Sequence, residues 1–322
     1  MNETLNQVKE LQCRINKSII GQEGLVERIL ISLLANGNLL LEGLPGLAKT
    51  RAVKSLAKEI DAKLTRIQFT PDLLPSDVTG SEIYQPELEE KFVFQAGPIF
   101  SNLVLADEIN RAPAKVQSAL LEAMEERQVS VAGKTYKMDP LFMVLATQNP
   151  VEQEGTYPLP EAQLDRFLMN VLVDYPSSES EKKVLRLVRS ENKSTPPVDN
   201  SESISQDVIF DARKQIEDIE VSDAVEQYIV DLINASRHAG EYQEDLGKLI
   251  DFGASPRGTI AIDSCARAYA WLNGRNYVTP DDVRAIVHDV LRHRLILSYE
   301  ASASGVDANT VIDKLLEVVA VA

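Results

Sequence analysis

The feature that most constrains this 322-residue chain is a series of short apolar runs separated by segments with helical spacing. The runs are "NLLLEG" from residue 38, "RIQF" from 66, "NLVLAD" from 102, "LFMVLAT" from 141 and "FLMNVLV" from 167. Uninterrupted apolar runs indicate strands buried on both faces, and strand–helix alternation is typical of a parallel sheet. We therefore expect an α/β domain whose parallel sheet is flanked by helices.

Other segments interrupt this scheme. Residues 2–35 have helical spacing and precede the first strand. Residues 70–100 are rich in proline and glycine and include "KFVFQAG", which makes them an insert. "QVSVAGKTYKM" at 128–138 alternates on both sides of Ala-Gly-Lys, which predicts a β-hairpin.

The pattern changes after Tyr175. Residues 176–203 are polar and hold three prolines, which predicts a linker interrupted by one short helix. From 204 onward the spacing is helical, with Ser222 and Thr279 as expected N-caps and Pro280 at a first helical position. We expect an α/β nucleotide-binding domain at 1–190 and a smaller, all-helical lid domain at 204–322.

Composition narrows the classes of function. The 33 basic residues against 49 acidic ones give a net charge of −16, which disfavours sequence-independent binding to nucleic acid. No apolar run approaches the roughly 20 residues that a membrane helix needs. Cys13 and Cys265 form no disulfide framework or metal spacing, so we expect a cytoplasmic protein.

The stretch "GLPGLAKT" at 43–50 nearly matches the phosphate-loop pattern G-x-x-x-x-G-K-[ST], with Ala48 in place of the second glycine. It follows an expected strand and opens an expected helix, where backbone N–H groups and the helix dipole favour phosphate. Lys49 would reach the β- and γ-phosphates of ATP, and Thr50 would offer its hydroxyl to Mg²⁺. The expected nucleotide-binding residues of the loop are Gly43, Pro45, Gly46, Leu47, Ala48, Lys49, Thr50 and Arg51.

Two further strands end in polar residues. In "NLVLADEINRAP", Asp107 would hold Mg²⁺ and Glu108 would polarise the water that attacks the γ-phosphate. In "VLATQNP", Asn149 would orient that water. Taken singly, the acidic pair has the alternative of a helix cap, and Asn-Pro has the alternative of a turn.

Two arginines complete the set. Arg166 in "LPEAQLDRFLMNV" suits an arginine supplied in trans to a neighbour's nucleotide, and Arg257 in "FGASPRGTIAI" suits a residue that reaches the γ-phosphate from the second domain. A salt bridge of Arg166 with Asp165 or Glu161, and a purely structural place at a helix end for Arg257, remain open as alternatives.

Together, "GLPGLAKT", "VLADEINRAP", "ATQNP" and "PEAQLDRF" resemble the MoxR family of AAA+ ATPases, over nearly the whole chain. The resemblance implies that Ala48 is accepted in the loop and that residues 70–100 are the helix-2 insert. It implies that Ile19, Ile20 and Gly21, in "IIGQE", lie beside the adenine. The remaining roles that it implies are the phosphate loop for Lys49 and Thr50, Walker B for Asp107 and Glu108, sensor 1 for Asn149, arginine finger for Arg166 and sensor 2 for Arg257. Arg111 is an alternative arginine in trans.

The resemblance further implies a Mg²⁺-dependent ATPase that assembles as a hexameric ring. Its work would be chaperone-like remodelling or maturation of protein complexes, some with metal cofactors, beside a partner that carries a von Willebrand factor A domain. The alternatives are a magnesium-chelatase-type motor subunit, a DNA-acting ring, a nucleotide-binding scaffold that hardly hydrolyses, and a small-molecule kinase. The hairpin at 128–138 is a hypothetical pore element, which deletion of its tip would test.

Overall fold

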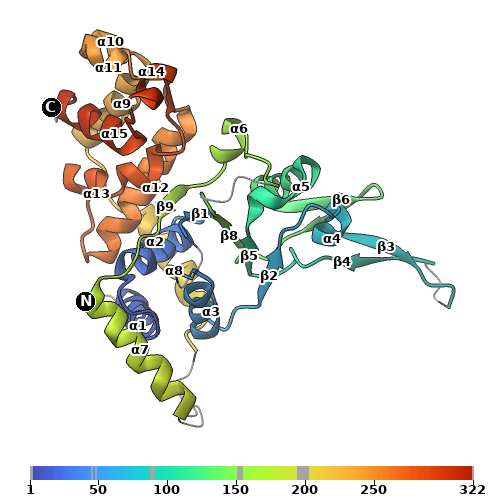
Figure 1. Ribbon diagram of the computed structural model, residues 1–322. Coiled ribbons are helices and arrows are strands. Elements are labelled where there is room, and N and C mark those ends of the chain that lie inside the picture. The colour runs from blue at the N-terminus through green and yellow to red at the C-terminus, as the bar shows by residue number, and fades with distance from the viewer. Residues whose placement is uncertain are drawn as a thin grey trace.

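The computed structural model describes residues 3–44, 46, 47, 49–87, 91–150, 155–193 and 203–320. Its centre is a five-stranded parallel sheet in the order β2-β5-β8-β1-β9. The strands are β1 (Leu39–Glu42), β2 (Leu64–Gln68), β5 (Leu103–Asp107), β8 (Met143–Gln148) and β9 (Met169–Leu172). All five expected strands are confirmed, and helices cover the sheet (Figure 1).

Side chains of successive strand residues enter two different cores, as the period of two requires. Leu39 and Leu41 of β1 belong to one apolar cluster, while Leu40 between them belongs to the other. The first cluster includes buried residues of α1 (Glu3–Ser18), α2 (Glu23–Leu34) and α3 (Lys49–Glu59). The second includes those of α5 (Ala114–Glu126), beside α4 (Pro75–Thr79). Burial on both faces explains why the strands lack polar alternation.

Two hairpins extend from the sheet on the side away from the lid (Figure 1). The expected hairpin is confirmed as β6 (Gln128–Val131) and β7 (Lys134–Lys137), joined by Ala132 and Gly133 at positive φ. Within the expected insert, β3 (Gly80–Tyr84) pairs with β4 (Phe92–Ala96). The rings of Phe94 and Tyr136 stack with centroids 3.9 Å apart, so the two hairpins support each other.

The lid is helical, as expected, except for a small antiparallel ribbon of β10 (Ile250–Phe252) and β11 (Ile296–Leu297). Its helices are α9 (Asp223–Arg237), α10 (Ala239–Tyr242), α11 (Glu244–Gly247), α12 (Pro256–Leu272), α13 (Pro280–Leu291), α14 (Tyr299–Ala303) and α15 (Ala308–Val318). The backbone N–H of Thr279 donates to Asp282 at 2.7 Å, which completes the expected start of α13. Ser222 stands at the N-cap position of α9 without a side-chain cap bond among the described residues.

The segment expected as a linker contains α7 (Ser178–Lys193), a helix of 16 residues rather than a short one. Helix α8 (Gln206–Glu217) follows, and it packs on α1 and α2 of the α/β domain as well as on α12. The division at 190 and 204 stays a prediction, because α8 contacts both parts. Within the described residues, no helix combines the length and the apolarity that crossing a membrane requires.

The side chain of Asn102, at the start of β5, allows a test of how buried hydrogen bonds stabilise the fold. Its buried side chain accepts from the N–H of Lys63 at 2.9 Å and donates to the carbonyl of Leu141 at 3.1 Å. Asn102→Ala leaves both groups without these bonds, so we expect the free energy of unfolding to fall by about 1–3 kcal/mol. Chemical denaturation measures it. Exposed Gln227→Ala is the control, with a change within about 0.5 kcal/mol, and an equal effect of the two variants would contradict the prediction.

Candidate functional site

The glycine-rich loop leaves β1 and enters α3 at the carboxyl edge of the sheet. Gly43 lies so close to the next strand that an added Cβ would meet the carbonyl oxygen of Val173 at 2.5 Å, and Gly46 has φ of +85°. Both positions therefore need glycine. Pro45 and Ala48, both expected to bind nucleotide, lie outside the described residues.

Lys49 is buried at the start of α3, and its Nζ donates to the carbonyl of Gly43 at 2.7 Å. Burial lowers the pKa of Lys49, while the nearby carboxylates of Asp107, Glu108 and Glu42 act in the opposite direction. The ammonium group thus lies inside the loop, where an incoming phosphate would replace a carbonyl as its partner.

A cavity of about 370 Å³ opens at this edge; we call it the loop cavity. Strands β1, β5 and β8 are neighbours and parallel, so their carboxyl ends meet here. The expected residues that line it are Gly46, Leu47, Lys49, Thr50, Arg51, Asp107, Glu108 and Asn149. Arg66, Thr147 and Gln148 complete the lining.

Three residues that sequence reasoning missed hold the two carboxylates. Thr147 Oγ1 donates to Asp107 at 2.6 Å and accepts from the N–H of Glu108 at 2.9 Å. Arg66 forms an ion pair with Asp107 at 2.6 Å, and Gln68 Nε2 donates to Glu108 at 2.8 Å. Their only sequence signal is their place in β2 and at the end of β8, strands next to β5.

Glu108 has a left-handed backbone, with φ of 59° and ψ of 51°. This uncommon conformation turns the chain sharply after β5, so that Asp107 and Glu108 leave the strand in different directions. Arg111 lies at 3.1 Å from Glu108 as an ion pair. The alternative arginine in trans therefore contacts the carboxylate of its own chain in this structure.

The donor set fits ATP with Mg²⁺. Among the described residues no group of three or more His, Cys, Asp or Glu forms a metal cage. Mg²⁺ does not need one, because it is held by one or two protein oxygens together with phosphates and water. Thr50 and Asp107 would supply those oxygens, Lys49 would bind phosphate, and Glu108 would accept a proton from water.

The expected adenine-side residues lie elsewhere in the described structure. Ile19 is buried in the core, and Gly21, with φ of +80°, packs against Ser180 and Pro176. None of Ile19, Ile20 and Gly21 is among the described residues that line the loop cavity. Their place beside adenine stays a prediction.

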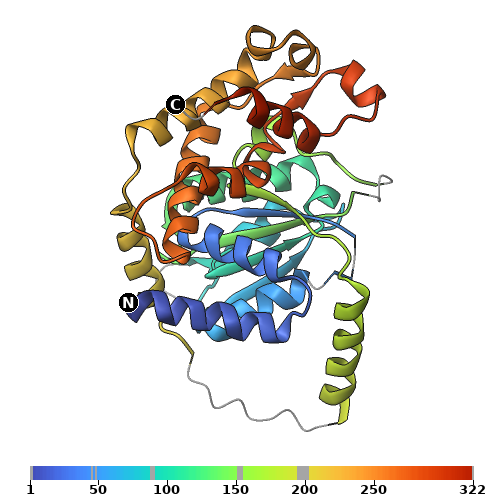
Figure 2. The same ribbon diagram turned by 90° about the vertical axis from the view of Figure 1, so that its left-hand side faces the viewer.

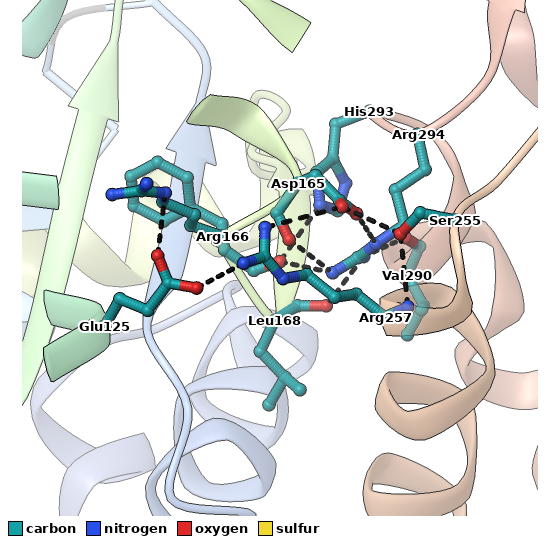
Figure 3. A network of polar contacts seen from close by, with 10 residues as sticks. Glu125, Asp165, Arg166, Leu168, Ser255, Arg257, Val290, His293 and Arg294 are labelled. Atoms are coloured by element: carbon teal, nitrogen blue, oxygen red, sulfur yellow. Dashed lines mark hydrogen bonds and ion pairs between the residues drawn. The ribbon is translucent and has the colours of Figure 1, made fainter. Parts of the chain in front are cut away.

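The two remaining arginines come together in a second cavity of about 310 Å³, the arginine cavity, which shares no described lining residue with the loop cavity. Glu125, at the end of α5, forms ion pairs with Arg166 Nε at 3.1 Å and with Arg257 (Figure 3). Arg166 lies three residues before β9 and Arg257 lies in the first turn of α12, so one carboxylate joins the α/β domain to the lid. The salt bridge expected as the alternative for Arg166 exists, but its partner is Glu125.

Asp165 fixes the lid at the same place. It lies just after α6 (Glu161–Leu164), accepts from Arg294 Nε at 2.9 Å, and accepts from Ser255 Oγ at 2.8 Å (Figure 3). Arg294 is buried and also donates to the carbonyl of Phe167 at 2.6 Å. A buried charge that is paired and fully hydrogen-bonded holds its partners in one geometry, so the two arginines of the arginine cavity have a rigid base.

Comparison with known proteins now defines the class. Residues 38–169 match the model of the ATPase family associated with various cellular activities (AAA), and residues 246–315 match the AAA lid domain. The fold is that of an AAA+ ATPase, and the chain is an ATP hydrolase. The scaffold and kinase alternatives are therefore set aside.

Relatives that match over most of the chain define the family. The chain is 45% identical to "Chaperone MoxR1" of Mycobacterium tuberculosis, across 95% of this chain and 80% of that protein. It is 33% identical to "Protein MoxR" of Paracoccus denitrificans, across 90% and 88%. A crystal structure from Cytophaga hutchinsonii, described as a candidate ATPase, superposes with a TM-score of 0.92 at 45% identity, across 99% and 96%. The chain belongs to the MoxR family of AAA+ ATPases.

Thr147 provides a test of the loop cavity. Thr147→Val keeps the shape but removes the bonds to Asp107 and Glu108, so we expect ATP turnover to fall about 10–100-fold and to need more Mg²⁺. Steady-state ATPase rates against Mg²⁺ concentration measure this. Thr147→Ser, which keeps the hydroxyl, should stay near the wild type. Unchanged turnover of the valine variant would show that the hydroxyl positions nothing essential.

His293 gives a pH test of the lid junction. It is buried beside the carbonyl of Phe167 at 3.1 Å, and burial together with the Arg294 charge lowers its pKa well below 6.5. Below about pH 6.5 the His293 imidazole binds a proton in the unfolded chain but stays neutral in the folded chain. The free energy of unfolding should therefore fall by up to about 1.4 kcal/mol per pH unit. Denaturant titrations from pH 7.5 to 5 measure it. His293→Gln should reduce the slope, and equal slopes would refute this assignment.

Proposed function

We propose that this ATPase works as a ring in which each ATP is bound by one subunit and completed by arginines of the next. The observation that carries the proposal is the separation of the loop cavity from the arginine cavity. Arg166 and Arg257 point to Glu125 rather than to the phosphate loop of their own chain. Guanidinium groups stabilise the charge of a transferring phosphoryl group, and supply from a neighbour makes hydrolysis depend on assembly.

Within the ring, Lys49 and Thr50 would bind the phosphates and Mg²⁺ together with Asp107. Glu108 would accept the proton of the attacking water, with Asn149 as its guide. Gln68 and Arg111 hold Glu108 in this structure, so engagement of water requires Glu108 to leave at least one of them. When a neighbour's phosphates bind Arg166 and Arg257, Glu125 would lose its ion-pair partners. Because Arg257 also lies close to Asp165, which accepts a hydrogen bond from Ser255 of the lid, this contact between lid and α/β domain would change as well.

The work done by this cycle is, we propose, chaperone-like remodelling or maturation of protein complexes. The name of the Mycobacterium tuberculosis relative, a chaperone, supports this. A hexamer, a partner with a von Willebrand factor A domain, metal-cofactor insertion and a cytoplasmic location remain proposals that rest on the family resemblance. A magnesium-chelatase-type motor would share the same site, and the acidic charge of −16 disfavours a DNA-acting ring.

A mixing experiment tests the shared site. Lys49→Ala abolishes a subunit's own ATP binding, and Arg166→Ala abolishes what it gives to its neighbour, so each pure variant should be inactive. In an equal mixture about one quarter of the sites combine an intact loop with an intact neighbouring arginine, and we expect about that share of wild-type ATPase activity.

The same mixture with Arg257→Ala tests the second arginine, and with Arg111→Ala the alternative one. Recovery with Arg166→Ala and Arg257→Ala, but not with Arg111→Ala, is the expected pattern. If mixtures stay as inactive as the pure variants although they assemble, the arginines act within their own chain and the shared site is wrong.

A further inference from the structure

Helix α7 carries an apolar stripe that faces solvent. Val184, Leu185 and Val188 are exposed to 36%, 51% and 39%. Val188 follows Val184 by four positions and Leu185 by three, and residues at these spacings lie on the same side of a helix, so the three form one stripe. Figures 1 and 2 both show α7 standing away from the body of the protein. An exposed apolar stripe on a helix that stands away from the protein body indicates a surface that binds a partner.

The same helix is basic, although the whole chain has a net charge of −16. Its exposed cationic residues are Lys182, Lys183, Arg186 and Arg189, which outnumber the exposed acidic residues Glu179 and Glu181. Lys183 and Arg189 flank the apolar stripe on its two sides. A partner that suits α7 therefore has an apolar groove with acidic borders.

The lid has such a groove. A cavity of about 440 Å³ lies between α9 and α12, and its apolar lining is Ile219, Val221, Ile229, Val230 and Ile260. Ile260 is 66% exposed and Val230 is 39% exposed. This apolar surface faces solvent in the single chain.

Acidic residues border the groove. Residues 215–236 include six acidic side chains and no lysine or arginine. The six are Glu217, Asp218, Glu220, Asp223, Glu226 and Asp231, of which the first five are exposed. Glu226 and Asp263 line the groove itself, together with Arg267, which forms an ion pair with Asp263, so Glu226 and the exposed acidic residues beside the groove carry its negative charge. The groove thus complements α7 in both apolar character and charge.

Position decides which copy of α7 fills the groove. In both ribbon views α7 and α9 lie at distant parts of the molecule (Figures 1 and 2). Contact between two different patches of identical chains is head-to-tail, the kind that builds rings.

The expected ring brings these patches together. Helix α7 starts six residues after β9, whose carboxyl end lies beside the phosphate loop. In the lid, Ile260 lines both the groove and the arginine cavity, one turn after Arg257. A neighbouring subunit that inserts its Arg257 into the loop cavity of the first subunit therefore also brings its α9–α12 groove close to that cavity. The α7 helix of the first subunit begins at the same edge of the sheet.

We propose that α7 of one subunit binds in the α9–α12 groove of the next subunit. This inference rests on the proposed shared ATP site, which orients the two subunits. It assigns the ring a contact outside the nucleotide, made by residues that take no part in hydrolysis.

Disulfide cross-linking of the full-length chain tests the contact between α7 and the groove of the next subunit. In a Cys13→Ser background, which removes the exposed native thiol, Leu185→Cys is placed on one protein and Ile260→Cys on another. Mixed with ATP and Mg²⁺ and mildly oxidised, they should form a disulfide between chains, whereas neither protein does so alone. Leu185→Cys paired with Tyr299→Cys, exposed in the lid outside the groove, is the control and should not cross-link.

Sedimentation velocity gives an independent readout. Leu185→Asp and Ile260→Asp should each weaken self-association by at least about tenfold, since an apolar anchor is replaced by a charge. Glu179→Gln, on the opposite side of α7, should leave it unchanged. Lys183→Glu with Arg189→Glu should also weaken association, and Asp223→Lys with Glu226→Lys in the same chain should restore it.

Other outcomes overturn the proposal. They are a disulfide that forms only when both cysteines are on one chain, unchanged self-association of Leu185→Asp, or stripe-dependent binding to phosphatidylserine vesicles without any effect on self-association. Failure of the shared site is seen separately: the mixture of Lys49→Ala and Arg166→Ala would stay inactive while the cross-link between chains still formed.

Discussion

Parallel pairing of the five central strands is the constraint on which the rest of this molecule depends. Because all five run in one direction, their carboxyl ends lie at one edge, and the polar residues at the ends of β5 and β8 face the same cavity as the loop that follows β1. Lys49, Asp107 and Asn149 come from three separate parts of the chain and meet there for this reason. Helices on both faces keep the strands apolar and leave the edge as the place for chemistry.

The buried pair of Asp165 and Arg294 is the second constraint. Arg294 lies three residues after the lid helix α13, whereas Asp165 lies before β9, so their contact sets the position of the lid on the sheet. Removing one partner would leave the other charged and buried, which is why such pairs hold a single arrangement. That arrangement puts Arg257 of the lid beside Arg166 of the α/β domain, with Glu125 between them.

These two constraints give the chain two unlike ends. One end carries the loop cavity and the basic helix α7, and the other carries the arginine cavity and the acidic groove between α9 and α12. In the proposed ring, each end meets the other end of a neighbour, so binding of nucleotide and contact between subunits are parts of one interface. Hydrolysis would then change this interface and, through Asp165, the lid.

The sequence by itself determined the elements whose signal is local: the five buried strands, the hairpin at 128–138, the glycine-rich loop and the start of α13 at Thr279. Apolar runs, turn residues and caps act over a few neighbours, so they can be seen without a structure. It also predicted which residues line the loop cavity, because strand ends in a parallel sheet converge.

Only the tertiary structure decided that Thr147, Arg66 and Gln68 hold the carboxylates, that Arg166 and Arg257 share Glu125, and that α7 stands free as a long helix. Those contacts join residues about 40 to 130 positions apart, and long-range pairing depends on strand order and lid position, for which no local pattern codes.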